Sequence, residues 1–492
     1  MDVLFIQDNG YLESLGVAEL SAALKLHGFS TGLLLLSHAK DAVEAVRRIS
    51  PRVAAFSCMT GYHKNILGFA AALKEKCPRL FTIMGGPHPT FFPETLELSP
   101  GLDAVCVGEG EEAIIELVRA LKDGLDYTQI QNLHVKADDK VVKNPVRDLI
   151  DDLDAFPLPD RGIYYDAYPF LAHMTMKRFI SGRGCPYRCS FCFNHQYNAL
   201  YRGKGRVVRK KSASRVFEEI ADVKRRWPLS TAHFSDDTFL LKDEWVEEFC
   251  ARCRREIGVP FTINARFDQI TRENAKMLKK AGCIGLSLGL ESGSEKIRNE
   301  ILNKKLDDAD IMRGAETLHS VGLKIMTTNM TSLPGESAED ALGTLKLNLK
   351  IRSDFGRLYS FWPFPKMDLT NHAIERGCIR DRIDVTTFDT SKKWICEEPR
   401  TRRVKENLEN VFTLAVMAPW SWEIFRRCLN LPPSILRIFQ LFNTFADVRF
   451  YRPKIISGIY YFINCASGVM SGNLFRISEK TFSRKTDERE SK

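Results

Sequence analysis

The chain has 492 residues and a formal net charge of +9, from 71 Lys and Arg against 62 Asp and Glu. Hydrophobic residues make up 44% and charged residues 27%, which excludes a disordered, collagen-like or polytopic membrane protein. The length predicts two to four domains at roughly 100–200 residues each, and so mild a positive charge does not by itself indicate nucleic-acid binding.

The first 125 residues alternate short apolar strands with helical stretches. We expect strands over 3–7, 31–37, 53–59, 81–86 and 104–107, and helices over 15–27, 67–76 and 111–122. This alternation predicts an α/β domain with a Rossmann-like, doubly wound parallel sheet, whose ligands bind at the carboxyl ends of the strands. Polar or glycine residues stand at those ends, namely Asn9, Gly10, Ser57, Gly85, Gly86, Gly108 and Glu109.

Residues 126–172 lose this alternation, and the acidic, proline-containing stretch 151–161 predicts a linker. From residue 173 to 380 strands and helices alternate again, with strands expected over 175–181, 232–235, 261–264, 285–288, 324–328 and 357–361. These repeats predict a central partial (β/α)6 TIM-like barrel. Residues 381–492 are aromatic-rich and basic, and they predict a helical C-terminal region.

The strongest chemical signal is a loop of three cysteines, Cys185, Cys189 and Cys192, after the first strand of the predicted barrel. Gly182 and Gly184 let the backbone curl, so that the three sulfurs can converge on one centre. A structural zinc site would need four ligands, and a bacterial ferredoxin run would continue to a fourth cysteine. Three thiolates on a 4Fe–4S cluster would instead leave one iron open for a substrate or cofactor.

At these residues the chain resembles the radical S-adenosylmethionine (radical SAM) superfamily, whose signature is a CxxxCxxC triplet with an aromatic residue, here Phe191, before the last cysteine. Residues 364–369 depart from the Pro-Gly-Thr turn that the family usually has there. Other segments resemble family motifs, in the same order and at strand ends: 234–239 with Asp236 and Asp237, 264–268, 289–292 with Glu291 and Ser292, and 333–337.

The N-terminal region resembles the cobalamin-binding domain that precedes this barrel in one large subclass. The resemblance rests on Gly85-Gly86-Pro87-His88 and on Gly108-Glu109-Gly110-Glu111. The Asp-x-His-x-x-Gly motif is absent, and His63 and His88 stand outside any such motif. We therefore expect that no protein histidine holds the lower face of cobalt.

The resemblance implies an enzyme with three cofactors: a 4Fe–4S cluster on the three cysteines, S-adenosylmethionine (SAM) on its open iron, and cobalamin on the N-terminal sheet edge. It implies that an electron from a flavodoxin or ferredoxin cleaves SAM to a deoxyadenosyl radical. Asp236, Asp237, Glu291 and Ser292 would contact SAM or the substrate. The leading hypothesis is methylation of an unactivated carbon in a small-molecule or natural-product substrate.

Three alternatives stay open at this point. A cobalamin-dependent cyclase or oxidative rearrangement enzyme, of the anaerobic porphyrin ester cyclase type, would add no methylene to its product. A methylthiotransferase acting on RNA is disfavoured, because the N-terminal domain lacks the cysteine triplet of that family. A non-catalytic corrinoid or iron–sulfur binding protein would not cleave SAM.

Other segments give weaker predictions. The start of the chain lacks a secretory signal, which predicts a reducing, cytoplasmic location. The basic stretch 202–211 predicts a solvated loop, and nucleic acid is not an expected partner. We expect Cys250 and Cys253 to be buried residues of a helix rather than a redox pair. Residues 455–475 carry no formal charge, but their polar residues favour packing on the barrel over a membrane span, with peripheral membrane contact as the alternative.

Overall fold

The computed structural model describes residues 1–8, 13–138, 140–381, 383–389 and 395–451. Asn9, Gly10 and the uncharged stretch 455–475 lie outside the described residues, so the predictions for them stay predictions. The chain forms two compact units: the first holds residues 1–173 and 196–211, and the second holds 174–195 and the described chain from 212 onward.

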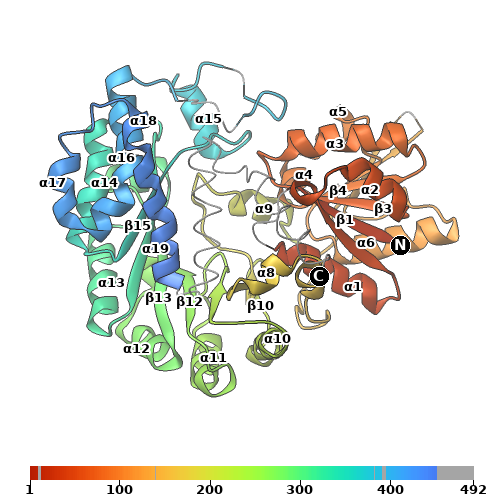
Figure 1. The fold of residues 1–492 in the computed structure, drawn as a ribbon, viewed down its shortest axis with the longest axis horizontal. Coiled ribbons are helices and arrows are strands. Elements are labelled where there is room, and N and C mark those ends of the chain that lie inside the picture. The colour runs from red at the N-terminus through yellow and green to blue at the C-terminus, as the bar shows by residue number, and fades with distance from the viewer. Residues whose placement is uncertain (9–12, 139, 382, 390–394, 452–492) are drawn as a thin grey trace, which may run out of the picture. The chain divides into compact units, whose positions relative to one another are not determined.

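The first unit is built on a seven-stranded sheet with the order β2-β1-β3-β4-β5-β6-β7 (Figure 1). Its first five strands are parallel, as the Rossmann-like prediction requires. β1, β3, β4 and β5 are buried because they carry largely apolar runs, whereas the edge strand β2 is mostly half-buried. The strands are β1 (Val3–Gln7), β2 (Thr31–Leu35), β3 (Val53–Ser57), β4 (Phe81–Gly85) and β5 (Ala104–Cys106). The helices between and after them are α1 (Leu15–Leu26), α2 (Ala42–Ile49), α3 (His63–Lys76), α4 (Pro87–Phe91), α5 (Thr95–Leu98) and α6 (Glu111–Asp123).

The region expected as a linker, 126–172, contributes an antiparallel hairpin to this sheet. β6 (Leu133–Ala137) pairs with β5, and β7 (Lys140–Lys143) pairs with β6. Leu133 and Val135 are buried while His134 and Lys136 are half-buried, which is the two-residue period of a strand with one covered face. Two short helices follow, α7 (Gly162–Tyr165) and α8 (Pro169–His173).

The second unit is an open half-barrel with six parallel strands in the order β15-β14-β13-β12-β11-β8, which confirms the predicted TIM-like fold. The strands are β8 (Met176–Phe179), β11 (Thr231–Phe234), β12 (Phe261–Ala265), β13 (Cys283–Glu291), β14 (Lys324–Thr331) and β15 (Phe355–Ser360). Helices cover its outer face: α10 (Ala213–Arg226), α11 (Asp243–Glu256), α12 (Arg272–Ala281), α13 (Asp308–Ser320) and α14 (Ala338–Lys350) (Figure 1).

The described C-terminal helices belong to the second unit. Leu408, Phe412 and Val416 of α16 (Pro399–Met417) share an apolar cluster with residues of α14 and β15. Phe450 of α19 (Leu441–Tyr451) packs on Met326 and Phe355. This part of the C-terminal region therefore closes the edge of the half-barrel sheet.

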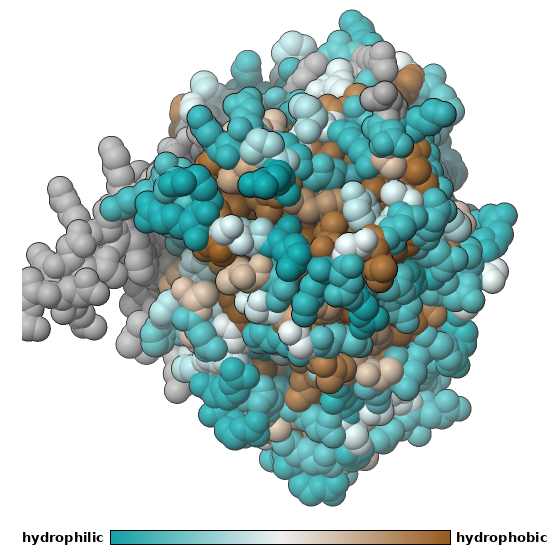
Figure 2. Space-filling view, turned by 90° about the vertical axis from the view of Figure 1, so that its right-hand side faces the viewer, coloured by the Kyte–Doolittle hydropathy of each residue, from teal (hydrophilic) through white to brown (hydrophobic). Residues whose placement is uncertain are grey.

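Figure 2 shows a face on which hydrophilic residues predominate and hydrophobic ones form smaller areas between them. Within the described ranges, no helix combines the length and the hydropathy that crossing a bilayer requires.

Candidate functional site

The cysteine loop begins where β8 ends, at the carboxyl edge of the half-barrel. The amide and the hydroxyl of Ser181 both donate to the carboxylate of Asp236, at 3.0 and 2.6 Å. Asp236 follows the neighbouring strand β11, so this pair of bonds fixes the start of the loop to the sheet. Gly184 has a φ of +90°, a conformation that favours glycine, and it turns the chain just before Cys185.

Two other segments hold the middle of the loop. Ser190 donates its amide to the carbonyl of Leu302 at 3.0 Å and its hydroxyl to the carbonyl of Ile301 at 2.7 Å. The carbonyl of Ser190 accepts from the amide of Leu369 at 3.0 Å. Ser190, one of the two residues between the second and third cysteines, is thus hydrogen-bonded to both segments.

Aromatic residues of the loop rest on an apolar layer. Phe191 and Phe193 pack against a cluster that includes Phe361, Met367 and Leu369. Residues 364–369, which depart from the family's usual turn, supply part of this layer. An apolar layer therefore lies next to the loop that carries the three thiols.

The three cysteines form no disulfide bonds, and they are half-buried. Burial raises the pKa of Cys185, and it raises the pKa of Cys192 to about 11. In the described part of the chain, no three His, Cys, Asp or Glu side chains converge closely enough to hold one metal ion. A 4Fe–4S cluster does not need such convergence, because each thiolate binds a different iron, so three thiols on one curled loop fit the cluster better than a mononuclear ion.

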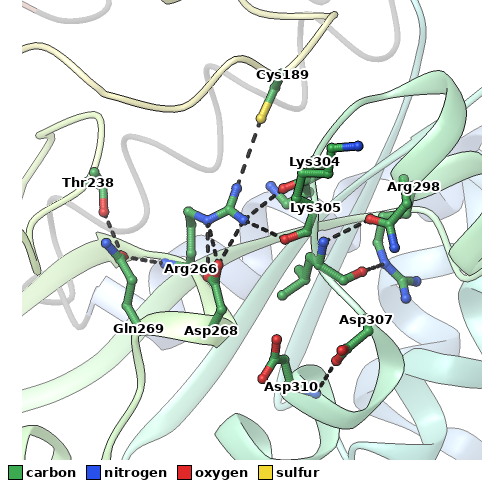
Figure 3. Close-up of polar contacts among 12 residues, drawn as sticks. Cys189, Thr238, Arg266, Asp268, Gln269, Arg298, Lys304, Lys305, Asp307 and Asp310 are labelled. Atoms are coloured by element: carbon green, nitrogen blue, oxygen red, sulfur yellow. Dashed lines mark hydrogen bonds and ion pairs between the residues drawn. The ribbon is translucent and has the colours of Figure 1, made fainter.

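Charged side chains near this loop form opposite-sign pairs, and Figure 3 shows one of them, Arg266 with Asp268. Arg266, which follows β12, bonds Asp268 at 2.9 Å and donates to Sγ of Cys189 at 4.0 Å. Lys304 bonds Glu291 at 3.2 Å, and both side chains are about nine-tenths buried or more, at 6% and 10% exposed. Burial raises the pKa of Asp237, whose negative charge in turn raises the pKa of Cys185 and Cys192.

Glycine makes room for the Glu291–Lys304 pair. A Cβ at Gly289 would stand 2.2 Å from Oε1 of Glu291 and 2.9 Å from Nζ of Lys304. Glu291 itself has a φ of +67°, a left-handed conformation that is unusual for a residue with a side chain. The predicted Gly-Leu-Glu-Ser element therefore folds a buried carboxylate back across the end of β13.

The four predicted SAM-contacting residues thus stand at the same strand edge as the cysteines, but in different surroundings. Asp236 already uses both carboxylate oxygens on Ser181, while Asp237 lies near the thiols. Ser292 is buried, its hydroxyl accepting from the amide of Ser294. The sequence analysis gave Arg266 and Lys304 no role at the site. Arg266 lies inside the quoted 264–268 motif, so its position as a basic residue at a strand end was a signal that could have found it.

In the first unit, the predicted cofactor residues line the loops after β3 and β4. The amide of Cys58, next to Ser57, donates to the carbonyl of Gly85 at 2.9 Å, and the amide of His88 donates to the carbonyl of Cys58 at 3.0 Å. Gly86 has a φ of +99°, and a Cβ there would lie 2.9 Å from the carbonyl oxygen of Cys58. These bonds hold the loops after β3 and β4 together at one edge of the sheet, with backbone groups close to one another there.

Two stacked histidines lie beneath this edge. The rings of His63 and His88 are 4.3 Å apart, and both residues are buried. The two nitrogens of His88 form hydrogen bonds with the hydroxyls of Thr60 and Thr95, at 3.1 and 2.9 Å. Both nitrogens of His88 therefore have hydrogen-bond partners inside the domain. Whether a histidine holds cobalt stays a prediction.

Gly108 and Glu109 contact a segment from later in the chain, residues 196–211. Tyr201 accepts from the amide of Glu109 at 2.9 Å, and a Cβ at Gly108 would lie 1.9 Å from the Tyr201 hydroxyl oxygen. Glu109 pairs with Arg209 through two bonds of 2.8 and 3.1 Å, with side chains 9% and 1% exposed. Whether Glu109 also contacts a cofactor stays a prediction.

The basic stretch 202–211 is therefore not simply the solvated loop that its composition predicts. Besides Arg209, it includes Lys211, which is buried and pairs with Glu19 at 3.1 Å. Arg206 pairs with Asp151 at 2.7 Å on the surface. Composition alone could not show this, because the acidic partners are spread over more than a hundred residues of sequence.

Cys250 and Cys253 are both buried on α11, as the sequence analysis expects. Burial raises the pKa of Cys250 to about 12 and also raises that of Cys253. Neither thiol has the thiolate character of a redox pair.

Comparison with known proteins finds a matching family model for each unit. The model of the radical SAM superfamily matches residues 179–347, and the model of the B12-binding domain matches residues 1–118. An uncharacterized methyltransferase of Pyrococcus horikoshii is 29% identical over 348 residues, which cover 69% of this chain and 73% of the relative. The anaerobic magnesium-protoporphyrin IX monomethyl ester cyclase of Rubrivivax gelatinosus is 27% identical over 415 residues, covering 79% and 72%.

A solved structure shares the fold of the whole chain. The cobalamin-dependent SAM radical enzyme OxsB with aqua-cobalamin bound superposes with a TM-score of 0.68 at 15% identity, covering 98% of this chain and 78% of that one. The chain belongs to the radical SAM superfamily, in the group whose members carry a B12-binding domain. It is a cobalamin-dependent radical SAM enzyme, and its cofactors are a 4Fe–4S cluster, SAM and cobalamin.

Proposed function

We propose that this enzyme methylates an unactivated carbon of a small-molecule substrate. The observation that carries the proposal is the pairing of a B12-binding and a radical SAM domain in one chain, together with a methyltransferase among its relatives. When bound, the cluster and SAM supply hydrogen abstraction from carbon, and cobalamin supplies a methyl group. We also propose that a flavodoxin or ferredoxin delivers the electron to the cluster.

In this proposal the residues of the half-barrel edge have separate tasks. Cys185, Cys189 and Cys192 bind the cluster, and Asp236 positions their loop through Ser181. Asp237, Glu291 and Ser292 are the proposed contacts for SAM or substrate, and Lys304 compensates the buried charge of Glu291. The apolar layer next to the loop would keep water away from these groups.

The first unit would hold the corrin ring along the carboxyl edge of its sheet. Ser57, Gly85, Gly86 and Gly108 are the described residues we assign to this edge. The predicted regions keep their proposed roles: 1–125 for cobalamin, 126–172 as the connection that also adds a hairpin to the sheet, 173–380 for radical chemistry, and 381–492 for closing the barrel and shaping the substrate pocket.

Cofactor counting tests the two binding assignments separately. The full chain is purified anaerobically and reconstituted with iron, sulfide and hydroxocobalamin, beside a variant in which the three loop cysteines are changed to Ala. We expect about four irons and one corrinoid per chain, with the iron alone lost in the variant. Iron without corrinoid would exclude the methyl-transfer proposal, and unchanged iron in the variant would exclude the cluster ligands.

A second candidate is ring formation or oxidative rearrangement, favoured by the similarity to the Rubrivivax cyclase. The reduced holoenzyme with SAM separates the candidates before the substrate is known. A methyltransferase yields both 5′-deoxyadenosine, from reductive cleavage, and S-adenosylhomocysteine, from methyl transfer. A cyclase yields 5′-deoxyadenosine without S-adenosylhomocysteine, and a non-catalytic binding protein yields neither.

A further inference from the structure

Arg266 is a buried cation in direct contact with the cysteine loop. Its side chain follows β12, and the residue is 6% exposed. One terminal nitrogen, Nη1, points to Sγ of Cys189 at 4.0 Å, a long N–H···S contact (Figure 3). Its guanidinium carbon lies 3.9 Å from the centre of the Tyr187 ring, two residues before that cysteine.

Further hydrogen bonds to three residues hold this guanidinium in place. Nε donates to Asp268 at 3.0 Å, and Nη2 donates to the same carboxylate at 2.9 Å. Nη2 also donates to the backbone carbonyls of Lys304 and Lys305, at 2.8 and 3.2 Å. The planar fork of arginine can serve all these partners at once, whereas the ammonium group of lysine could not.

We propose that Arg266 is a positioning residue that sets the reduction potential of the 4Fe–4S cluster, through its charge next to the Cys189 sulfur. The inference rests on the proposed function, because it takes Cys189 as a cluster ligand. Reduction takes one electron from the external donor and adds one negative charge to the cluster and its thiolates. A fixed cation at this distance stabilises the reduced form more than the oxidised form and so raises the potential.

Other charges near the cysteine loop also act on the reduction potential. Asp268, bonded to Arg266, offsets part of its charge, and Asp237 places a negative charge near Cys185 and Cys192. Lys304 and Glu291 form a pair that adds little net charge. The net charge next to the Cys189 sulfur therefore depends mainly on Arg266 and Asp268. Substitution of Arg266 makes this charge more negative, and substitution of Asp268 makes it more positive.

The test is a redox titration of the reconstituted full chain, followed by the electron paramagnetic resonance signal of the reduced cluster. Arg266→Gln should lower the equilibrium constant for reduction roughly tenfold, a shift of about 59 mV to more negative potential for a one-electron couple. Asp268→Asn should shift the potential the other way, since it leaves the Arg266 charge without its counter-ion. Arg266→Lys, which keeps the charge, should shift it less than Arg266→Gln.

Arg298 provides the matched control. It is completely buried, and it also holds this region in place, through the carbonyls of Leu306 and Ser292 and the carboxylate of Asp308. We expect Arg298→Gln to lower stability without moving the potential. Equal shifts in Arg266→Gln and Arg298→Gln would show a merely structural role and overturn the inference.

Iron content separates failure of this inference from failure of the proposed function. An unchanged potential in Arg266→Gln, with its iron content intact, would overturn the role of Arg266 alone. If Arg266→Gln loses its iron, Asp268→Asn decides: a raised potential supports the inference, and an unchanged or lowered one overturns it. Iron retained after loss of the three loop cysteines would instead show that the proposed ligands are wrong.

Discussion

The two units offer very different chemistry at the carboxyl ends of their parallel strands. At the edge of the first unit, the polar groups are backbone amides, glycines, threonines and histidines, such as His88 with its two threonine partners. At the edge of the half-barrel, thiols stand among charges joined in pairs, such as Arg266 with Asp268 and Lys304 with Glu291. The strand ends around His88 therefore carry uncharged groups, whereas those around the cysteine loop carry paired charges.

Under the proposed function, this difference follows the ligand that each edge would hold. A corrin ring is wide and presents mostly its face, which glycine-rich backbone can approach closely. A reducible cluster and SAM carry charge that changes during the reaction, and buried charge requires a nearby partner. The first unit does contain a buried ion pair, Glu109 with Arg209, but that pair holds the segment 196–211 in place.

Removal of the three loop cysteines should have the largest effect and test the comparison directly. We expect Cys185, Cys189 and Cys192→Ala to abolish cluster iron while corrinoid binding persists, because the two edges use separate residues. Inductively coupled plasma analysis for iron and the absorption spectrum of the corrinoid measure both. The Cys250 and Cys253→Ala double variant is the control and should keep its iron; loss of corrinoid with the iron would show that the edges depend on each other.

Breaking the buried pair of the first unit should come next. Glu109→Gln leaves Arg209 buried without its charge partner, which should cost about 3–5 kcal/mol of unfolding free energy in that unit. Urea unfolding followed by circular dichroism measures the loss. Asp151→Asn, which breaks the exposed pair with Arg206, should change little. A small effect at Glu109 would mean that segment 196–211 is held by its apolar contacts instead.

A glycine at the first edge gives a smaller effect. Gly108→Ala should cost about 2–3 kcal/mol, since the new Cβ meets the Tyr201 hydroxyl and φ is +83°. Gly124→Ala is the matched control: its φ is +70°, but nothing lies within 4 Å of the new Cβ, so about 1 kcal/mol is expected. The difference between the two unfolding free energies isolates the Tyr201 contact, and equal costs would contradict it.

The fold could be predicted from the sequence wherever a periodic signal was strong. Runs such as Val3–Gln7 and Val53–Ser57 are apolar throughout, as strands covered on both faces must be. The hairpin at 133–143 was not predicted, because the nearby acidic stretch 151–161 indicated a linker and outweighed a short alternating pattern. At 31–37 the expected strand ends at Leu35 and a 3-10 turn over Leu36–His38 follows, a boundary that propensity alone does not give.

The candidate site could be predicted only as far as its motifs are local. The cysteine triplet can be recognised from the sequence alone, since its three members lie within eight consecutive residues. Arg209 and Arg266 both stand in segments that were noticed, yet their partners Glu109 and Cys189 are 100 and 77 residues away. Such pairs depend on which strand ends meet at one edge, and a single sequence does not specify that for side chains.

The interior of the half-barrel allows one further test of how the second unit treats charge. His233 on β11 is buried, its Nδ1 bonds the hydroxyl of Thr262 at 2.9 Å, and burial lowers its pKa to about 3, with Arg178 and Arg357 adding to the shift. In the unfolded chain the group would titrate near its ordinary pKa of 6.5. Between these values the unfolded state binds the proton and the folded state does not, so stability falls as pH decreases through this window.

At pH 5 this histidine should therefore cost about 2 kcal/mol of unfolding free energy relative to pH 7.5 or above. We expect His233→Gln to remove that part of the acid sensitivity while other groups continue to titrate. Urea unfolding of the cofactor-free chain at both pH values, followed by tryptophan fluorescence, gives the comparison. If the variant loses as much stability at pH 5 as the unmodified chain, His233 is not held neutral, and the half-barrel interior accommodates an extra proton beside its arginines.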